Sequence, residues 1–461
     1  MKTASAIDVH PLRAGLAGQA LVPGDDGYEQ ARQIWNALID KRPAVIARCL
    51  TTADVVRAVG FARSCRLPLA VRGGGHNIAG SALAEGGLVI DLSGMKRVTV
   101  DASARRASVE PGALLADVDA ATQAHGLAVP VGINSTTGIA GLTLGGGFGW
   151  LSRKYGMTVD NLESAEVVTA AGEVVQADAQ AHADLFWALR GGGGNFGVVT
   201  RFGFRLHPVG PNLMSGLIVY DARDARKVLA GYRAFMATAP DDLSVWTVLR
   251  LAPPLPFLPA EVHGRPVLAL ALLYTGDPAR GEPLVAPLRE LAAPLGAHVG
   301  VQPYVAWQQA FDPLLARGAR NYWKSHNFIE LDDGLFDAAL EALERLPSPQ
   351  CEIFLAALGG ATRRPAPDAT AYAHRDTRFV VNVHARWEDA KDDARCIAWA
   401  RWFFQASARF ASGSVYVNFL TEDESDRTGA AYGPNHRRLA EIKRRYDPEN
   451  LFHTNQNIRP S

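Results

Sequence analysis

The sequence lacks an excess of charge of either sign. Its 461 residues include 47 basic and 47 acidic side chains, and no block of like charge stands out. Proteins that bind nucleic acid or anionic membranes usually concentrate positive charge on one face or segment. The balance therefore argues against both kinds of partner and favours a small, largely uncharged ligand.

Cysteine is also scarce. The chain has only four cysteines, and no two of them have the spacing of zinc ligands or of a disulfide framework: Cys49, Cys65, Cys351 and Cys396. The twelve histidines are dispersed, and none forms a His-Glu-x-x-His pair. We expect a protein of the reducing cytoplasm that holds no metal.

Long hydrophobic runs are missing as well. No stretch approaches the roughly 20 apolar residues of a membrane-spanning helix, and residues 1–20 lack the continuous apolar core of a secretory signal. The chain has neither a Walker A sequence nor a Gly-x-Ser-x-Gly elbow. These absences argue against a membrane protein, a P-loop enzyme and a serine hydrolase.

What the first half contains is a mixture of short helices and strands. Residues 28–40 and 52–65 have helix-like apolar spacing, and Thr51 or Thr52 can cap the second helix, with Asp54 in its first turn. Brief apolar, β-branched runs bounded by glycine, proline or charge predict strands at 43–47, 67–72, 87–91, 107–110 and 167–170. This pattern predicts a mixed α/β region.

A linker follows the alternating strand predicted at residues 198–206. The sequence His-Pro-Val-Gly-Pro at 207–211 is the clearest break in the chain. Beyond it, an α+β domain with an antiparallel sheet backed by helices is predicted from strands at 216–220, 267–274 and 379–383 and helices at 221–238, 334–346 and 389–407. From residue 415 the composition changes again, and a last helix is predicted at 435–445.

One predicted strand of this domain, at residues 351–357, has no clear inward face. Either Cys351, Ile353 and Leu355 or Glu352, Phe354 and Ala356 can point into the domain, because alternate residues of a strand face opposite sides. Alternation alone does not choose between the two sets, and neither set indicates a substrate.

Three consecutive glycines precede a histidine in the run from Arg72 to Ser81. Glycines free the backbone to adopt positive φ, so several N–H groups can converge on one anion, such as a pyrophosphate. The run also delivers a nucleophile-capable imidazole, His76, directly after the glycines. The alternative interpretation is a tight turn followed by a buried structural histidine.

A second glycine cluster occupies residues 138–149 and leads into Arg153-Lys154-Tyr155-Gly156. A single glycine loop is often only a turn. Two loops of this density in one α/β domain, with Asp160 and Asn161 following, favour a long cofactor that lies between backbone segments.

The spacing of a third glycine cluster matches that of a dinucleotide-binding motif. Gly192, Gly194 and Gly197 have the required spacing, but the segment before them is predicted helical and the segment after them is predicted to be a strand. A Rossmann turn needs strand, loop and then helix. We therefore exclude NAD and expect a loop that approaches a flat ring system, with Asn195 available for hydrogen bonding.

Together these motifs resemble the berberine bridge enzyme-like group of FAD-linked oxidases, within the vanillyl-alcohol oxidase and p-cresol methylhydroxylase (PCMH) superfamily. The resemblance runs over nearly the whole chain. Besides the first two glycine clusters it includes Leu185-Phe186-Trp187, Asn195-Phe196-Gly197, Tyr416-Val417-Asn418-Phe419, Tyr432-Gly433-Pro434-Asn435, the run from Tyr446 to Phe452 and Asn455-Gln456-Asn457-Ile458.

The resemblance implies an α+β fold with a PCMH-type FAD module. Residues 1–207 and 415–461 would form the module, and residues 208–414 would cover the substrate. FAD would be joined through its 8α-methyl carbon to His76. Many relatives add a bond from a cysteine four residues before the glycine that matches Gly138, but this chain has Asn134 there. A single covalent bond, through His76 only, is therefore expected.

The resemblance also implies functional residues. Those expected to bind the cofactor are Arg72, Gly73, Gly74, Gly75, His76, Asn77, Gly80, Ser81, Thr137, Gly138, Gly141, Gly145, Val199, Asn418 and Asn455. For the proton step Tyr416 is the first candidate, because similar enzymes place this tyrosine over the reactive face of the flavin. Tyr372 and His374 are reserves, and Lys324 could supply a cation that lowers the phenol pKa.

The implied reaction is hydride removal from a small alcohol, amine or sugar hemiacetal, with O2 as second partner and hydrogen peroxide as by-product. A flavin dehydrogenase or oxidative cyclase of secondary metabolism is the nearest alternative. A noncatalytic flavin- or carbohydrate-binding protein is the alternative of another class, and the presence of both His76 and Tyr416 argues against it.

Overall fold

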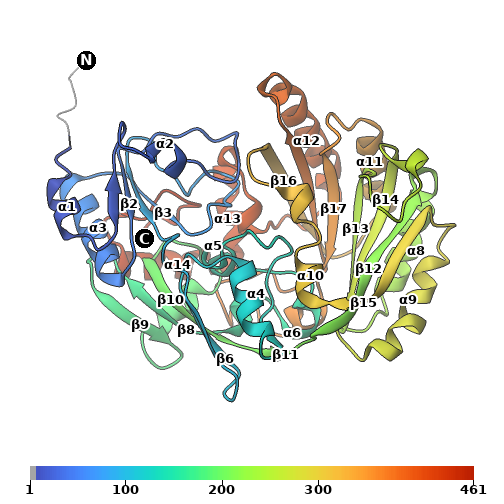
Figure 1. The fold of residues 1–461 in the computed structure, drawn as a ribbon, viewed down its shortest axis with the longest axis horizontal. Coiled ribbons are helices and arrows are strands. Elements are labelled where there is room, and N and C mark those ends of the chain that lie inside the picture. Colours follow the sequence, from blue (N-terminus) through green and yellow to red (C-terminus); the bar gives the residue numbers. More distant parts are fainter. Residues whose placement is uncertain (1–6) are drawn as a thin grey trace.

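The computed structural model describes residues 7–461 and shows two halves that lie side by side (Figure 1). The first half holds two small sheets, and the second holds one sheet of seven strands. The C-terminal residues, red in Figure 1, return to the first half. Of the N-terminal segment expected to lack a secretory signal, residues 1–6 lie outside the described residues.

The first sheet has four strands in the order β1-β2-β4-β3, and β4 pairs in parallel with both β2 and β3. The strands are β1 (Gln19–Leu21), β2 (Val45–Arg48), β3 (Leu69–Arg72) and β4 (Leu88–Asp91). Helix α3 (Thr52–Cys65) begins as predicted, because Thr51 and Asp54 form a capping box. The short helices α1 (His10–Gly15) and α2 (Tyr28–Ala31) lie at its borders.

The second sheet has five antiparallel strands in the order β5-β6-β10-β8-β9. They are β5 (Val98–Asp101), β6 (Arg106–Val109), β8 (Leu162–Val168), β9 (Val174–Asp178) and β10 (Val198–Arg205). One apolar core joins this sheet to several helices, among them α4 (Leu115–Gln123), α7 (Ala183–Leu189) and α14 (His436–Tyr446). Because α14 comes from the end of the chain, the C-terminal segment completes the first half.

The third sheet is antiparallel throughout, in the order β15-β12-β14-β13-β17-β18-β16. Its strands are β12 (Asn212–Asp221), β13 (Leu243–Leu251), β14 (Pro266–Tyr274), β15 (Gly296–Pro303), β16 (Arg320–Phe328), β17 (Glu352–Ala357) and β18 (Phe379–Trp387). Helices pack against one face: α8 (Ala225–Met236), α9 (Gly281–Arg289), α11 (Asp333–Glu344) and α12 (Asp393–Ser407). The sheet begins just after the predicted linker, where β11 (His207–Pro208) pairs with β7 (Leu127–Ala128).

The helix predicted at residues 28–40 is wrong beyond its first turn, because α2 ends at Ala31. The residues that follow bond to the other half of the molecule. The Trp35 indole donates to the carbonyl of Leu315 at 2.8 Å, and the Asn36 side chain bonds to the backbone of Asn321. These contacts replace the helical hydrogen bonds that the apolar spacing suggested.

The exclusion of a Rossmann turn agrees with the structure. The third glycine cluster follows helix α7 and precedes strand β10, which is the order inferred from the sequence. The first two glycine clusters meet at Gly74 and Gly138. A Cβ atom on Gly74 would lie 2.4 Å from the Gly138 nitrogen, so only glycine allows the two loops to cross.

This crossing generates a prediction. Gly74→Ala should lower the free energy of unfolding by about 2 kcal/mol and reduce the flavin content, because the new methyl group meets backbone that cannot rotate away. Thermal unfolding and the ratio of flavin to protein absorbance measure both effects. Gly60→Ala, on the exposed face of α3 with no atom near its new methyl group, is the control. Equal behaviour of the two variants would contradict the prediction.

Candidate active site

One large cavity lies between the glycine loops of the first half and the inner face of the seven-stranded sheet. The residues expected to bind the cofactor gather there, with three exceptions. Those that line the cavity are Gly73, Gly74, Gly75, His76, Asn77, Ser81, Thr137, Gly138, Gly141, Val199, Asn418 and Asn455. Segments from five separate parts of the sequence thus form one wall.

The three exceptions support this wall from behind and do not line it. The Arg72 guanidinium forms a bidentate ion pair with Asp91, which satisfies it away from the cavity. Gly80 has φ +72°, and a Cβ there would lie 2.7 Å from Ile39. A Cβ on Gly145 would lie 2.2 Å from the Asn418 side-chain oxygen. Direct contact of these three residues with the cofactor stays a prediction.

His76 is fixed in the cavity wall by two neighbours that the sequence did not indicate. Its ring stacks on Trp35 with centroids 4.9 Å apart, and its Nε2 lies 2.9 Å from the hydroxyl of Thr136. Burial, with a smaller contribution from Arg317, lowers the pKa of His76 to about 3. The imidazole is therefore neutral at pH 7, as a nucleophile must be.

The hydrogen bonds around Asn134 assign the tautomer of His76. The Asn134 Oδ1 accepts from the backbone N–H of Thr136 at 3.0 Å, so it also accepts from the Thr136 hydroxyl at 2.7 Å. That hydroxyl has no second proton to give, and it must accept from Nε2–H of His76. The lone pair of His76 is consequently on Nδ1, near Thr137.

Tyr416 lines the same cavity and is held by two donors. Its hydroxyl oxygen accepts from the backbone N–H of Gly147 and from the side chain of Asn418, both at 3.0 Å. Burial raises the pKa of Tyr416 to about 12, although both donors oppose this change. The side chain is thus a neutral phenol at rest, with two N–H groups placed to stabilise negative charge on its oxygen.

The two reserve candidates lie behind Tyr416 and do not line the cavity. The ring of Tyr372 is 6.5 Å from that of Tyr416, and burial raises the pKa of Tyr372 well above its usual range. His374 bonds through Nε2 to the carbonyl of Ala431 at 2.9 Å, and burial lowers its pKa. A role for either side chain in the proton step stays a prediction.

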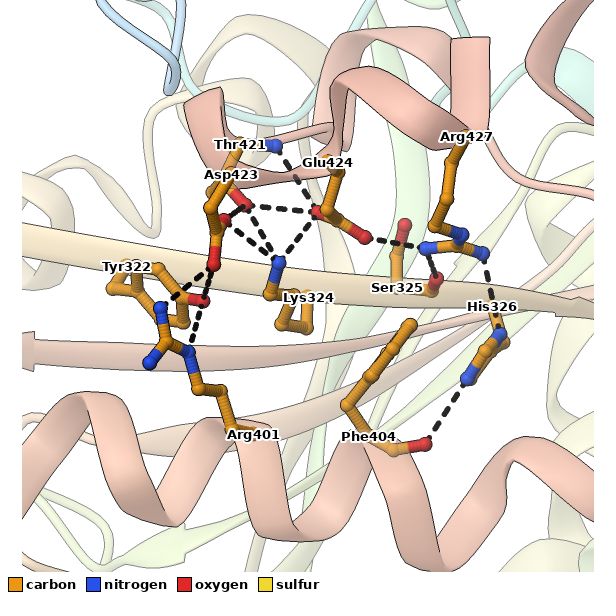
Figure 2. Close-up of polar contacts among 10 residues, drawn as sticks. All are labelled: Tyr322, Lys324, Ser325, His326, Arg401, Phe404, Thr421, Asp423, Glu424 and Arg427. Carbon is orange, nitrogen blue, oxygen red and sulfur yellow. Dashed lines mark hydrogen bonds and ion pairs between the residues drawn. The ribbon is translucent and has the colours of Figure 1, made fainter. Parts of the chain in front are cut away.

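Lys324 lies outside the cavity, which corrects its expected role as the cation near Tyr416. Figure 2 shows its ammonium among three residues of the segment that follows the Tyr-x-Asn motif. Lys324 Nζ is 3.0 Å from the Thr421 hydroxyl, 2.8 Å from Asp423 and 3.1 Å from Glu424. Its neighbour Trp323 faces the cavity instead, because adjacent residues of a strand point to opposite sides. Lys324 anchors the chain beyond Tyr416.

The cavity also contains a polar group that sequence reasoning did not assign. Arg250, Glu352 and His384 come from β13, β17 and β18, and all three line the cavity. Arg250 pairs with Glu352 at 2.6 Å, and Glu352 lies 3.5 Å from Nδ1 of His384. Glu352 and Phe354 are therefore on the cavity side of β17, which answers the question of its inward face. The sequence signal that could have found these residues was a single charged side chain within an otherwise apolar strand.

Among residues 7–461, no cluster of His, Cys, Asp or Glu side chains is arranged to hold a metal ion. In the same part of the chain, no helix combines the length and the apolar character needed to cross a membrane. No cysteine lines the cavity within the described residues.

The Lys324 anchor generates a stability prediction. Lys324→Met should lower the free energy of unfolding by about 3 kcal/mol, because the nearly buried carboxylate of Glu424 loses a partner. Arg401→Met is the matched control, since Arg401 pairs with the same segment through Asp423 but is half exposed, and should cost less than about 1 kcal/mol. Urea denaturation of both variants measures the difference. A loss for Lys324→Met no larger than for the control would refute the anchoring role.

Two family models match parts of this chain. Residues 43–178 match a family model described as FAD binding domain, and residues 415–459 match one described as berberine and berberine like. An FAD-linked oxidoreductase of Dictyostelium discoideum is 32% identical over 98% of this chain and 97% of its own length.

Two further proteins extend the likeness. (R)-6-hydroxynicotine oxidase of Paenarthrobacter nicotinovorans is 30% identical over 96% of this chain and 97% of its own length. The structure of BBE-like 1 from Physcomitrella patens superposes with a TM-score of 0.89 and 25% identity, and the match covers 99% of this chain and 100% of that one. The chain belongs to the berberine bridge enzyme-like family of FAD-linked oxidoreductases.

Proposed function

We propose that this enzyme is an oxidase that removes hydride from a small alcohol, amine or sugar hemiacetal and passes the electrons to O2. We further propose that His76 alone holds the flavin covalently and that the enzyme acts in the cytoplasm. The observation that carries the proposal is that the neutral His76 and the phenol of Tyr416 line one cavity. A noncatalytic binding protein would need neither group.

The cavity wall fits the isoalloxazine and pyrophosphate of FAD. Residues 73–75 expose backbone without side chains, and the crossing of Gly74 and Gly138 brings two such segments together. Backbone N–H groups at glycine turns suit anionic phosphates. Asn418 and Asn455 add amide groups to the lining. When bound here, the flavin supplies a two-electron acceptor for the substrate.

His76 and its neighbours support attachment through one bond. Thr136 and Asn134 leave the lone pair of His76 on Nδ1, and this nitrogen is the one that we propose forms the bond. Asn134 occupies the position where many relatives have a second linking cysteine, and here it orients the Thr136 hydroxyl instead. The same side chain therefore favours a single bond through His76 and selects the nitrogen.

Tyr416 is proposed to hold and move the proton of the oxidised group. At rest it is neutral, since burial raises its pKa to about 12. The N–H groups of Gly147 and Asn418 stabilise the phenolate form once a proton is withdrawn. Oxygen reactivity separates an oxidase from a dehydrogenase: rapid reoxidation of the reduced enzyme in stopped-flow measurements is expected, and slow reoxidation would favour the dehydrogenase alternative.

The covalent bond can be tested by acid denaturation. Yellow colour should remain with the precipitated wild-type chain, whereas His76→Ala should bind flavin that acid releases into the supernatant. His125→Ala, which changes an exposed histidine outside the cavity, should keep its colour in the pellet. A colourless wild-type pellet would exclude covalent attachment, and a coloured His76→Ala pellet would assign the bond to another residue.

The proton step can be tested separately. Tyr416→Phe should slow anaerobic reduction of the flavin by about 100-fold while the substrate dissociation constant changes little, since only the hydroxyl is lost. Tyr155→Phe, which removes a hydroxyl bonded to the carbonyl of Pro208 outside the cavity, is the control. If Tyr416→Phe reduces its flavin as fast as the control, Tyr416 takes no part in the proton step.

A further inference from the structure

One segment of the second half reaches across to the surroundings of His76. It follows α10 (Tyr304–Gln308), which lies beside α4 of the first half (Figure 1), and it contains a short 3-10 helix at Asp312–Leu315. We call residues 309–317 the bridging segment. Four of its residues line the cavity: Ala310, Phe311, Leu314 and Leu315. The bridging segment therefore joins the second half to the cavity wall.

The carboxylate of Asp312 binds one residue of the first half at two points. Its Oδ1 accepts from the backbone N–H of Ser135 at 2.9 Å, and its Oδ2 accepts from the Ser135 hydroxyl at 2.5 Å. Ser135 is buried, so its N–H and hydroxyl need partners inside the protein. Asp312 provides both, and hydrogen bonds to a charged group are stronger than those between neutral groups.

Ser135 lies between the two residues that orient His76. Asn134 precedes it and Thr136 follows it, and the Thr136 hydroxyl, which donates to Asn134, accepts from Nε2–H of His76. A rotation of the Ser135 backbone moves both neighbours, because consecutive residues share planar peptide groups. The contact with Asp312 therefore acts on the ring of His76 through a single turn of the chain.

Helix α4 holds the other side of this loop. Leu115 N–H donates to the Thr137 carbonyl and Ala116 N–H donates to the Ser135 carbonyl, both at 2.9 Å. The first half thus holds Ser135 at its carbonyl, and the second half holds it at its N–H. If Asp312 were removed, the N–H would lose its partner and the loop could turn about the two carbonyl contacts.

The bridging segment also reaches two other neighbours of His76. The Trp35 ring, which stacks on the imidazole, donates its indole N–H to the carbonyl of Leu315 at 2.8 Å. Arg317 donates to the Gln33 carbonyl, and its charge adds to the effect of burial in lowering the pKa of His76. The hydrogen-bond partner, the stacking partner and the nearby charge of His76 are therefore all connected to this one segment.

From these contacts we infer that Asp312 is a positioning residue for covalent flavin attachment, because it holds the loop of Asn134 and Thr136 that keeps the lone pair of His76 on Nδ1. The inference rests on the proposed bond through His76 and adds a residue of the second half to it. Attachment forms a bond between Nδ1 and the 8α carbon and breaks one C–H bond of the methyl group and the Nε2–H bond. O2, the oxidant of the proposed function, takes the two protons and two electrons as H2O2. Asp312 takes no part in this exchange.

The rate of attachment tests the inference. Full-length apoprotein, produced without riboflavin, is mixed with FAD, and samples are precipitated with acid over time to follow the yellow colour of the pellet. Asp312→Ala should attach flavin about 10-fold more slowly than the wild type, because the imidazole loses its fixed position.

Asp312→Asn is the rescue variant, because it keeps the shape of the side chain and both contacts. Its amide oxygen can accept from the Ser135 N–H while its NH2 group donates to the Ser135 hydroxyl, so attachment should stay within about 2-fold of the wild-type rate. A loss in Asp312→Asn as large as in Asp312→Ala would contradict a role that depends on these two hydrogen bonds.

Gln308→Ala is the matched control. Gln308 also lies in the contact between the halves, where its amide bonds to Asp119 at 3.1 Å and to the carbonyl of Gly132 at 3.3 Å, but it does not line the cavity. This variant should lose stability and keep the wild-type rate of attachment. It separates the positioning of His76 from a general weakening of the contact between the halves.

A second readout reports on the imidazole before any flavin is bound. In apoprotein with isotope-labelled histidine, NMR signals of the His76 ring nitrogens, assigned by their absence in His76→Ala, should show the Nε2–H form in the wild type and in Asp312→Asn. In Asp312→Ala the Nδ1–H form should be populated as well, so the two nitrogen shifts should move toward each other. A merely structural role of Asp312 would leave these shifts unchanged.

Three results would overturn the inference: attachment as fast in Asp312→Ala as in the wild type, attachment equally slow in Gln308→Ala, or ring nitrogens of His76 that do not respond to Asp312→Ala. The proposed function fails in a different way. A wild-type pellet without colour would exclude the covalent bond, and the ring nitrogens would then decide alone whether Asp312 positions His76.

Discussion

The crossing of two backbone loops at Gly74 and Gly138 is the constraint on which the site depends. One loop ends strand β3 and presents His76, and the other begins α5 (Ile139–Leu144) and continues to the residues beside Tyr416. A Cβ atom on either glycine would lie 2.4 Å from the backbone nitrogen of the other, so a side chain at either position would force the loops apart. The contact therefore sets the distance between the nucleophilic histidine and the phenol, although neither glycine has any chemistry of its own.

The environment of each candidate side chain determines its charge. Burial keeps His76 and Tyr416 neutral, in the first case by lowering a pKa and in the second by raising one. Lys324 pairs with the carboxylates of Asp423 and Glu424, and its role is therefore structural (Figure 2). The anchoring contact thus uses ion pairs, whereas the two groups proposed to react are neutral. A neutral imidazole and a neutral phenol are what a nucleophile and a proton carrier require in a buried site.

Much of the architecture could be predicted from the sequence, because local signals dominate it. Thr51 and Asp54 define the start of α3, and the order of α7 and β10 around the third glycine cluster excludes a dinucleotide turn. Residues 32–40 could not be predicted, since Trp35 and Asn36 bond to the other half of the molecule. Helical spacing records local preference only, and here tertiary contacts prevail.

The parts of the site that lie in sequence motifs could be predicted. The parts that form when strands pair could not. Glycine runs and the Tyr-x-Asn motif led to the loop side of the cavity. The direction of Lys324 depends on the pleat of β16, and the meeting of Arg250, Glu352 and His384 depends on the register of three strands that are far apart in sequence. A one-residue shift in register would turn each of these side chains to the opposite face.

The two faces of the seven-stranded sheet have different roles, because one packs against helices and the other lines the cavity. On β12, β13 and β14, one set of alternate residues packs against the helices, and the other set faces the cavity. Residues of the second set point away from these helices, because adjacent residues of a strand face opposite sides of the sheet. Such a wall permits new ligand preferences to arise by changes at every second position, while the flavin half and its glycine crossing stay as they are. Ligand specificity can therefore diverge within this architecture through changes on one face of the sheet, while the fold stays the same.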